Sequence, residues 1–216
     1  MPVLSISENE IIGMESRRRA AFMNSLTGFK SASLIGTIDA HGNTNLAIFS
    51  SVTHLGSNPA LIAFVNRPDS TERHTWENIL ATRQYTINHI HQDFYSKAHQ
   101  TSARYPKEIS EFAAVGLTPE FIEGCKAPFV KESRIKYSLE YVEHHPLQIN
   151  GTILVIGKVV QVVIPQGCLG PDGAIEIEEA GTIAISGLDR YHATQRLARL
   201  SYAKPDKLPE ILDGKE

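Results

Sequence analysis

Residues 45–78, NLAIFSSVTHLGSNPALIAFVNRPDSTERHTWEN, decide the fold of this chain. An apolar stretch ends at Ser50-Ser51, a turn follows, and a second apolar run covers residues 61–65. Polar residues then gather where a short helix is predicted to begin, namely Asn66, Arg67, Asp69, Ser70, Thr71, Arg73, His74 and Thr75. Hydroxyls, cations and free backbone N–H groups at the start of a helix suit a phosphate. The segment therefore predicts a site for a phosphorylated cofactor.

The sequence on both sides of this segment predicts a mainly β structure with short helices. The turn residues Asp39-Ala40-His41-Gly42 join two predicted strands. The Ile- and Val-rich run 151–164 is long for one straight strand, so we expect a bulge near Gly157. Strands are predicted at 32–38, 43–50, 61–65, 84–90, 135–142, 151–164 and 183–185. Short helices are predicted from Thr71 or Thr75 to Leu80, at 94–102 and at 107–114. Strands joined mostly by hairpins indicate an antiparallel, Greek-key-like barrel and not a doubly wound parallel sheet.

The two ends of the chain are predicted to be helical or frayed. Residues 10–26 predict one amphipathic helix, which Gly28 ends. A second helix is predicted at 193–200, and the polar, Pro-interrupted tail is expected to fray or to lie over a neighbour. We expect one domain over residues 1–216, with its core at about 14–202 and the tail at 203–216.

Composition excludes several classes of protein. The 216 residues are 42% hydrophobic, enough for one buried core, and a net charge of −3 argues against general nucleic-acid binding. Apolar runs are shorter than the ~20 residues of a membrane span, and the acidic N-terminus does not resemble a signal peptide. Two cysteines, Cys125 and Cys168, favour free thiols in a reducing cytosol. We therefore expect a cytoplasmic protein that binds neither nucleic acid nor membrane.

The common nucleotide-binding motifs are missing from the sequence. No G-x-G-x-x-G follows a predicted strand, and no G-x-x-x-x-G-K-[ST] occurs. The predicted phosphate site must therefore be local, made by Arg67 and the loop that follows it.

Three runs in a fixed order carry a family resemblance: SLIGTIDAHGNTNLAIFSSVTHLGSNPALIAFVNRP, then HTWENI, then YTINHI. Together they resemble the flavin reductase-like family, an FMN-binding split β-barrel. The resemblance covers about residues 14–164 and weakens toward residue 202. It implies FMN as the cofactor, with residues 45–52 along the flavin ring and ribityl chain and residues 67–78 around the phosphate. It also implies a homodimer with the flavin near the subunit interface.

The residues themselves agree with a flavin. Backbone groups at the end of the strand can bond the polar edge of an isoalloxazine without any charged side chain, and serine hydroxyls add donors or acceptors. Thr75 suits either a helix cap or a phosphate ligand, and Asn78 lies on the same side of that helix. The candidate cofactor-binding residues are Asn45, Ala47, Phe49, Ser50, Ser51, Val52, Arg67, Ser70, Thr71, Arg73, His74, Thr75 and Asn78. Many family members have Lys-Asp-Thr where this chain has Arg73-His74-Thr75, which leaves the role of His74 open.

Histidines and tyrosines outside this segment give weaker signals. Tyr191 and His192 lie where the resemblance places a segment close to the flavin, although a surface loop is the alternative. His89 and His91 are spaced to share one face of a strand, but no motif supplies a third metal ligand, so no metal is expected. The run 144–146, His-His-Pro, predicts a turn between two strands.

These observations favour an NAD(P)H-dependent flavin oxidoreductase. It would pass a hydride from nicotinamide to FMN, and electrons onward to a flavin or protein acceptor. Hydride transfer requires no acid–base side chain, which fits the lack of a catalytic constellation. A non-catalytic FMN-binding electron carrier is the first alternative, and a His-based metal-binding barrel is the second.

Overall fold

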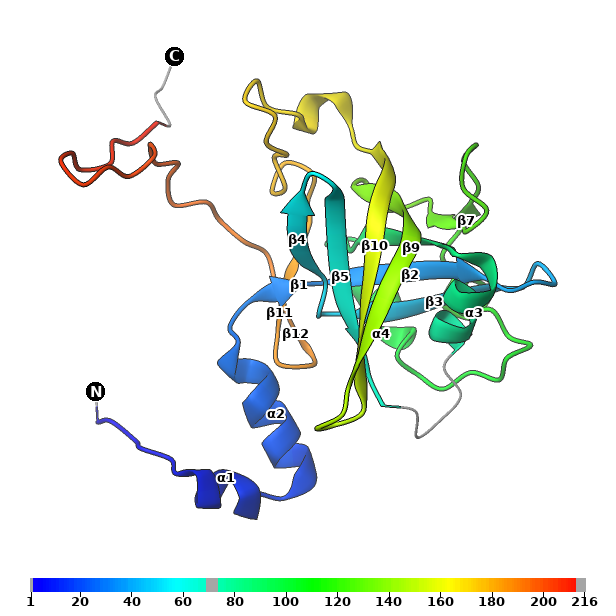
Figure 1. Cartoon of the computed structure of the whole chain (residues 1–216), viewed down its shortest axis with the longest axis horizontal. Coiled ribbons are helices and arrows are strands. Elements are labelled where there is room, and N and C mark those ends of the chain that lie inside the picture. Colours follow the sequence, from blue (N-terminus) through cyan, green and yellow to red (C-terminus); the bar gives the residue numbers. More distant parts are fainter. Residues whose placement is uncertain (1, 69–73, 213–216) are drawn as a thin grey trace.

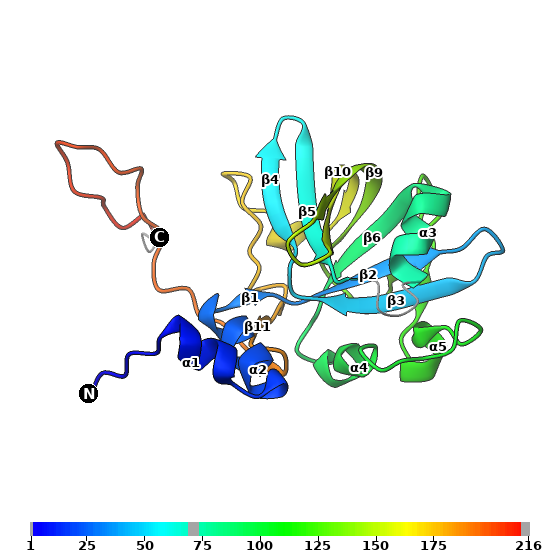
Figure 2. The same cartoon turned by 60° about the horizontal axis from the view of Figure 1, so that its bottom comes forward.

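Seven antiparallel strands form one sheet that curls into a barrel (Figures 1 and 2). The computed structural model describes residues 2–68 and 74–212. The strands lie side by side in the order β3 (Thr44–Phe49), β2 (Ser33–Ile38), β6 (Gln84–His89), β9 (Lys136–Leu147), β10 (Thr152–Val163), β5 (Ala60–Asn66) and β4 (Thr53–Ser57). The predicted antiparallel split barrel is confirmed. The edge strand β4 was not predicted.

The hairpin of β2 and β3 forms where the turn residues predict it. The carboxylate of Asp39 accepts hydrogen bonds from the backbone N–H groups of His41 and Asn43, both at 2.8 Å. Gly42 has a φ of 91°, a conformation that glycine adopts without strain. The turn fixes the register of β3, and with it the position at which β3 ends.

The long hairpin of β9 and β10 carries the predicted bulge. The pairing shifts register between Ile156 and Gly157, where β10 passes over the side chain of Tyr85. The predicted turn at 144–146 is wrong, because β9 continues to Leu147. Beyond Tyr141 this strand pairs, among the described strands, with β10 alone, and a strand with one open side accommodates Pro146.

Two hydrophobic clusters make up most of the core. The first fills the barrel and includes Phe64, Tyr85 and Trp76, the last from helix α3 (His74–Thr82). The second lies between the sheet and helices α4 (Tyr95–Gln100) and α5 (Glu111–Val115), and includes Phe94 and Phe112. The remaining short elements are β7 (Pro119–Glu120), β8 (Phe129–Val130) and a 3-10 turn at Gln166–Cys168.

Both ends of the chain extend from a second, three-stranded sheet of β1 (Lys30–Ser31), β11 (Ala184–Ser186) and β12 (Arg190–His192). Before β1, helices α1 (Glu8–Gly13) and α2 (Ser16–Leu26) replace the single helix predicted over 10–26. After β12, residues 193–212 form an extended arm (Figure 1), so the helix predicted at 193–200 is wrong. No helix within residues 2–68 and 74–212 is long and apolar enough to cross a membrane.

Candidate functional site

The segment from Ser50 to Val52 lies between the end of β3 and the start of β4, beside the end of β5. The Ser51 hydroxyl accepts a hydrogen bond from Val65 N–H at 3.0 Å and donates to the Val65 carbonyl at 3.2 Å. The hydroxyl of Ser31 on β1 donates to the Val52 carbonyl at 3.2 Å. The segment is therefore fixed from two sides, by β5 and by the small sheet.

The backbone N–H groups of this segment form a row of available donors. Ser50, Ser51 and Val52 are half-buried, and no partner for their N–H groups occurs among residues 2–68 and 74–212. Half-buried backbone donors without partners are uncommon and suit a ligand that presents a row of acceptors. The polar edge of an isoalloxazine presents such acceptors, so this donor set fits a flavin. Nearby, Phe49 directs its ring into the barrel against Phe64, with ring centroids 5.0 Å apart, and Ala47 lies opposite Ile35 of β2.

A buried polar network fixes the beginning of α3. The amide of Asn45 donates to the hydroxyls of Thr75 at 2.9 Å and of Thr37 at 3.2 Å. Asn78 donates to the same Thr37 hydroxyl at 3.2 Å. All four side chains are buried. The predicted residues Asn45, Thr75 and Asn78 are thus brought together, and their mutual bonds join α3 to the β2–β3 hairpin.

Arg67 follows β5 directly and is exposed. Among the described residues no carboxylate pairs with its guanidinium. Burial lowers the pKa of Lys30, and the positive charge of Arg67 lowers it further, so two cations share this side of the molecule. The predicted phosphate ligands Ser70, Thr71 and Arg73 lie outside the described residues.

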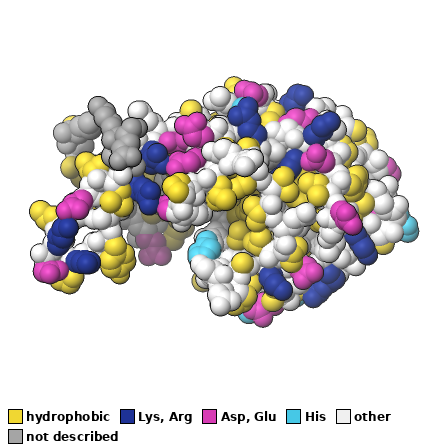
Figure 3. Space-filling model, turned by 90° about the horizontal axis from the view of Figure 1, so that it is seen from above, with side chains coloured by type: hydrophobic (Ala, Val, Ile, Leu, Met, Phe, Trp, Pro, Cys, Tyr) yellow, Lys and Arg dark blue, Asp and Glu magenta, His cyan; other side chains and the backbone are white. Residues whose placement is uncertain are grey.

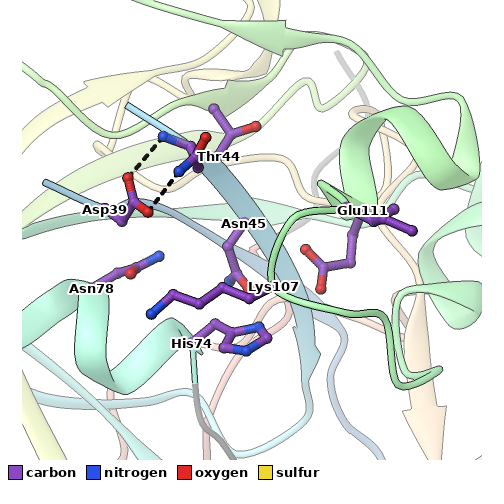
Figure 4. A pocket seen from close by; sticks show the side chains of 9 residues that line it. Asp39, Thr44, Asn45, His74, Asn78, Lys107 and Glu111 are labelled. Carbon is purple, nitrogen blue, oxygen red and sulfur yellow. Dashed lines mark hydrogen bonds between the residues drawn. The ribbon is translucent and has the colours of Figure 1, made fainter. Parts of the chain in front are cut away.

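A small pocket lies beside the start of α3 (Figure 4). His74 lines it with Asn45 and Asn78, together with residues that were not predicted for the site: Asp39, Lys107 and Glu111. Glu111 is buried, and its Oε2 accepts a hydrogen bond from Leu46 N–H at 2.9 Å. This bond satisfies a backbone group on the open edge of β3. Two carboxylates, Asp39 and Glu111, make the pocket a poor phosphate site, and Arg67 does not line it.

Tyr191 and His192 lie on β12 and contact different neighbours. The Tyr191 hydroxyl is 2.8 Å from His99 Nδ1, burial raises the pKa of Tyr191 to about 12, and its side chain packs against the same core cluster as Ile48 of β3. His192 Nε2 lies 2.8 Å from the Ser186 hydroxyl, and its ring packs against Phe29 at 4.8 Å. Neither side chain is hydrogen-bonded to residues 47–52 in the part of the chain that the structure describes.

The histidines at positions 89, 91 and 144 make contacts that stabilise the fold. Burial lowers the pKa of His89 to about 4, so this ring is neutral at pH 7. His91 Nδ1 accepts a hydrogen bond from Asp93 N–H at 3.1 Å. His144 lies on β9 and contacts the Tyr141 hydroxyl at 2.6 Å. Within residues 2–68 and 74–212 no group of three His, Cys, Asp or Glu side chains is placed to hold a metal. Both cysteines are buried free thiols.

Comparison with known proteins assigns the chain to a family. The chain is 55% identical to a split-barrel protein from Shewanella frigidimarina NCIMB 400 that is grouped with the flavin reductases, and the match covers 93% of this chain and 100% of that chain with a TM-score of 0.90. Nitrilotriacetate monooxygenase component B from Bacillus cereus shares the fold at 21% identity, over 93% of this chain and 100% of that chain, with a TM-score of 0.80.

A curated relative and a family model complete the comparison. An uncharacterized protein from Aquifex aeolicus (strain VF5) is 30% identical over 115 residues, which are 52% of this chain. The match spans 59% of the length of that relative. The model of the flavin reductase like domain matches residues 29–173, from just before β1 to the loop beyond β10, and so includes both the Ser50–Val52 donors and the start of α3. By this match the chain belongs to the flavin reductase-like family.

Proposed function

We propose that this protein binds FMN and works as an NAD(P)H-dependent flavin oxidoreductase, passing electrons to a flavin or protein acceptor. The observation that carries the proposal is the row of backbone donors at Ser50, Ser51 and Val52, which have no partner in the described part of a chain of the flavin reductase-like family. When bound, FMN would supply the hydride-accepting ring.

The residues of the chain have distinct roles in this proposal. Backbone N–H groups of the Ser50–Val52 segment hold the polar edge of the ring, and the Ser51 hydroxyl keeps that segment against β5. Arg67 neutralises the phosphate with a charge-assisted hydrogen bond. The Asn45–Thr75 bond holds the start of α3 where its N–H groups face the same phosphate. Ser70, Thr71 and Arg73 are proposed as further phosphate ligands.

Positioning is the main contribution of the protein to this reaction. A nicotinamide stacked on the exposed face of the flavin needs alignment and exclusion of water, and no side chain has to donate or accept a proton. Tyr191 is the better placed of the two flavin-proximal candidates, because it packs with Ile48 against one cluster beside β3. We propose a homodimer as the working form.

Titration of the flavin-free protein with FMN tests the proposal. We expect binding of one FMN per chain, measured by the quenching of flavin fluorescence, and weaker binding of riboflavin. A protein that gives no flavin signal on titration contradicts the assignment. Anaerobic mixing of the loaded protein with NADH or NADPH then separates the two flavin functions. Rapid bleaching identifies the oxidoreductase, and a flavin that stays oxidised identifies an electron carrier.

A further inference from the structure

A recess of about 320 Å³ opens at the C-terminal end of helix α3, where the chain passes from that helix into β6. The residues that line it come from the helix end, from the loop before β8 and from β9: Thr82, Arg83, Gln84, Lys126, Glu140 and Tyr141. The nine residues of α3, a length of about 12 Å, separate this recess from the helix start at which the phosphate of FMN is proposed to bind. The recess is therefore a separate site, of a size that suits a small ligand.

Arg83 has a backbone conformation that favours glycine. Its φ is 63°, and no other non-glycine residue within residues 2–68 and 74–212 has a positive φ. The conformation is fixed from both sides, because Arg83 N–H donates to the Ile79 carbonyl at 2.9 Å and the Arg83 carbonyl accepts from Tyr141 N–H at 2.9 Å. Glycine or asparagine usually fills this position after a helix, since most side chains destabilise it. An arginine at this position therefore points to a role for its side chain.

The guanidinium of Arg83 lies over the ring of Tyr141, with Cζ 3.9 Å from the ring centroid. The ring is itself held in place, because the Tyr141 hydroxyl is 2.6 Å from His144 Nδ1. Among the described residues the guanidinium makes no ion pair or hydrogen bond, so it does not cap the last carbonyls of α3, the ordinary role of a cation there. Stacking fixes the plane of the guanidinium and leaves the N–H groups at its edge available.

Three further polar groups line the recess with Arg83. Lys126 is exposed, and its ammonium has no acceptor in the part of the chain that the structure describes. Gln84 Oε1 accepts a hydrogen bond from Lys126 N–H at 3.1 Å, which leaves the Gln84 Nε2 amide as a donor. Glu140 lies directly opposite Gln84 across the β6–β9 pair and forms no ion pair within residues 2–68 and 74–212. The recess thus holds two cations and one carboxylate, all three available to a ligand.

The distribution of charge over the molecule makes this local set decisive. The chain has a net charge of −3, and Figure 3 shows basic and acidic side chains interspersed over one face of the barrel. A broad positive field that would attract any anion is not seen on that face. Recognition in the recess therefore depends on matching the two cations and the carboxylate one by one.

We propose that this recess binds an α-amino acid with an acidic side chain. Such a ligand carries two carboxylates and one ammonium, the complement of Arg83, Lys126 and Glu140. The planar guanidinium of Arg83 pairs with the α-carboxylate, Lys126 pairs with the side-chain carboxylate, and Glu140 accepts from the ammonium. A dicarboxylate without the ammonium would leave Glu140 beside two negative charges, so the site selects for the amino group. The inference goes beyond the proposed function and does not depend on flavin binding.

Titration of the full-length protein with L-glutamate at constant ionic strength, followed by ¹⁵N NMR, tests the proposal. We expect saturable shifts of the amide resonances at the recess and a dissociation constant of about 1 mM or lower. Glutarate, which lacks the ammonium, and 4-aminobutyrate, which lacks the α-carboxylate, should each bind about 10-fold more weakly or worse. Glu140→Gln should abolish the preference for glutamate over glutarate.

Arg83→Gly is the decisive variant, because glycine suits the positive φ and the protein should unfold at the same temperature or higher. Its dissociation constant for glutamate should rise about 10-fold or more. Lys131→Ala is the matched control, since Lys131 is an exposed cation that does not line the recess.

Three outcomes would overturn the proposal. Shifts that do not saturate show that the recess holds no ligand of this class. Equal affinities of the wild type for glutamate and glutarate remove the role of Glu140. Equal losses in Arg83→Gly and Lys131→Ala show attraction by surface charge in general. FMN titration of the same samples reports on the proposed function separately, since either property can fail while the other holds.

Discussion

The hydroxyl of Ser51 satisfies both backbone polar groups of Val65, taking its N–H at 3.0 Å and giving a hydrogen bond to its carbonyl at 3.2 Å. Here β4 has separated from β5, so one side chain completes the ladder that a strand would otherwise supply. Only the hydroxyl of Ser51 makes this contact, and the Ser51 N–H has no partner within residues 2–68 and 74–212. A structural bond within the strand end thus keeps the proposed flavin donors in place.

Ser51→Ala should destabilise the protein by about 1–3 kcal/mol, because it leaves two half-buried backbone groups of Val65 without a partner. Urea unfolding measures this loss. The affinities for FMN and riboflavin should fall by the same factor, since the hydroxyl positions the ring-binding segment and not the phosphate. Ser50→Ala is the control, because the Ser50 hydroxyl has no hydrogen bond among the described residues. An unchanged unfolding midpoint in Ser51→Ala would contradict this role.

Arg67→Ala should weaken FMN binding about 10- to 100-fold and leave riboflavin binding nearly unchanged, because only FMN carries the phosphate. Isothermal titration of both ligands measures the difference. Lys158→Ala is the control. Lys158 is an exposed cation on β10 that lies opposite Leu61 of β5, about 20 Å along the strand from Arg67, so its loss should change neither affinity. Equal losses for the two ligands in Arg67→Ala would show a structural role.

Glu111→Gln should remove a loss of stability that the wild type suffers as pH rises. Burial raises the pKa of Glu111 above its ordinary value of 4.5, against smaller opposing effects of the Leu46 N–H bond and His74. The folded state therefore binds more protons than the unfolded state just above pH 4.5, so stability falls as pH rises through the raised pKa. The carboxamide keeps an acceptor for Leu46 N–H but cannot ionise.

Urea unfolding at a series of pH values above 4.5 compares the two proteins. Lys107, His74 and Asp39 line the same pocket and are present in both proteins, so the comparison isolates the change at Glu111. Glu108→Gln, an exposed neighbour in the preceding segment, should follow the wild type. Identical pH profiles for Glu111→Gln and wild type would refute the expectation.

Gly157→Ala should cost about 1–3 kcal/mol of stability, because the new methyl group would overlap the hydroxyl of Tyr85 below the bulge of β10. Tyr85→Phe alone should be close to neutral, since this buried hydroxyl has no hydrogen-bond partner among the described residues. In the Tyr85→Phe background the cost of Gly157→Ala should shrink. Thermal unfolding of the four proteins gives the coupling energy, and a coupling of zero would disprove the contact.

Local signals predicted the parts of the fold that local chemistry determines. The Asp39 to Gly42 turn, the short helix of His74 and the bulge at Gly157 each depend on neighbouring residues, and all three are present. The edge strand β4 was missed because its sequence, THLGS, has no apolar alternation and because it pairs with β5 alone among the described strands. The arm was mistaken for a helix because its shape depends on ion pairs with the distant residues Asp172 and Glu176.

For the candidate site, the sequence likewise predicted the residues of one continuous segment and not those that contact it from elsewhere. Ser51, Asn45 and Thr75 belong to one segment, and its order and spacing pointed to them together. Glu111 and Ser31 contact that segment from elsewhere in the chain, by hydrogen bonds to the backbone of Leu46 and of Val52. No pattern in the sequence predicts such contacts.

The bond from Ser31 to the Val52 carbonyl joins the small sheet to the proposed flavin donors. Residues 2–29 and 193–212, at the two ends of the chain, extend from that same sheet. In the proposed homodimer, a partner subunit that contacts these ends would therefore also restrain the strand end that binds the ring. Association of the subunits and binding of the flavin are then coupled equilibria. Dilution of the protein should therefore release flavin, and the yellow colour of the solution should fall more steeply than the protein concentration.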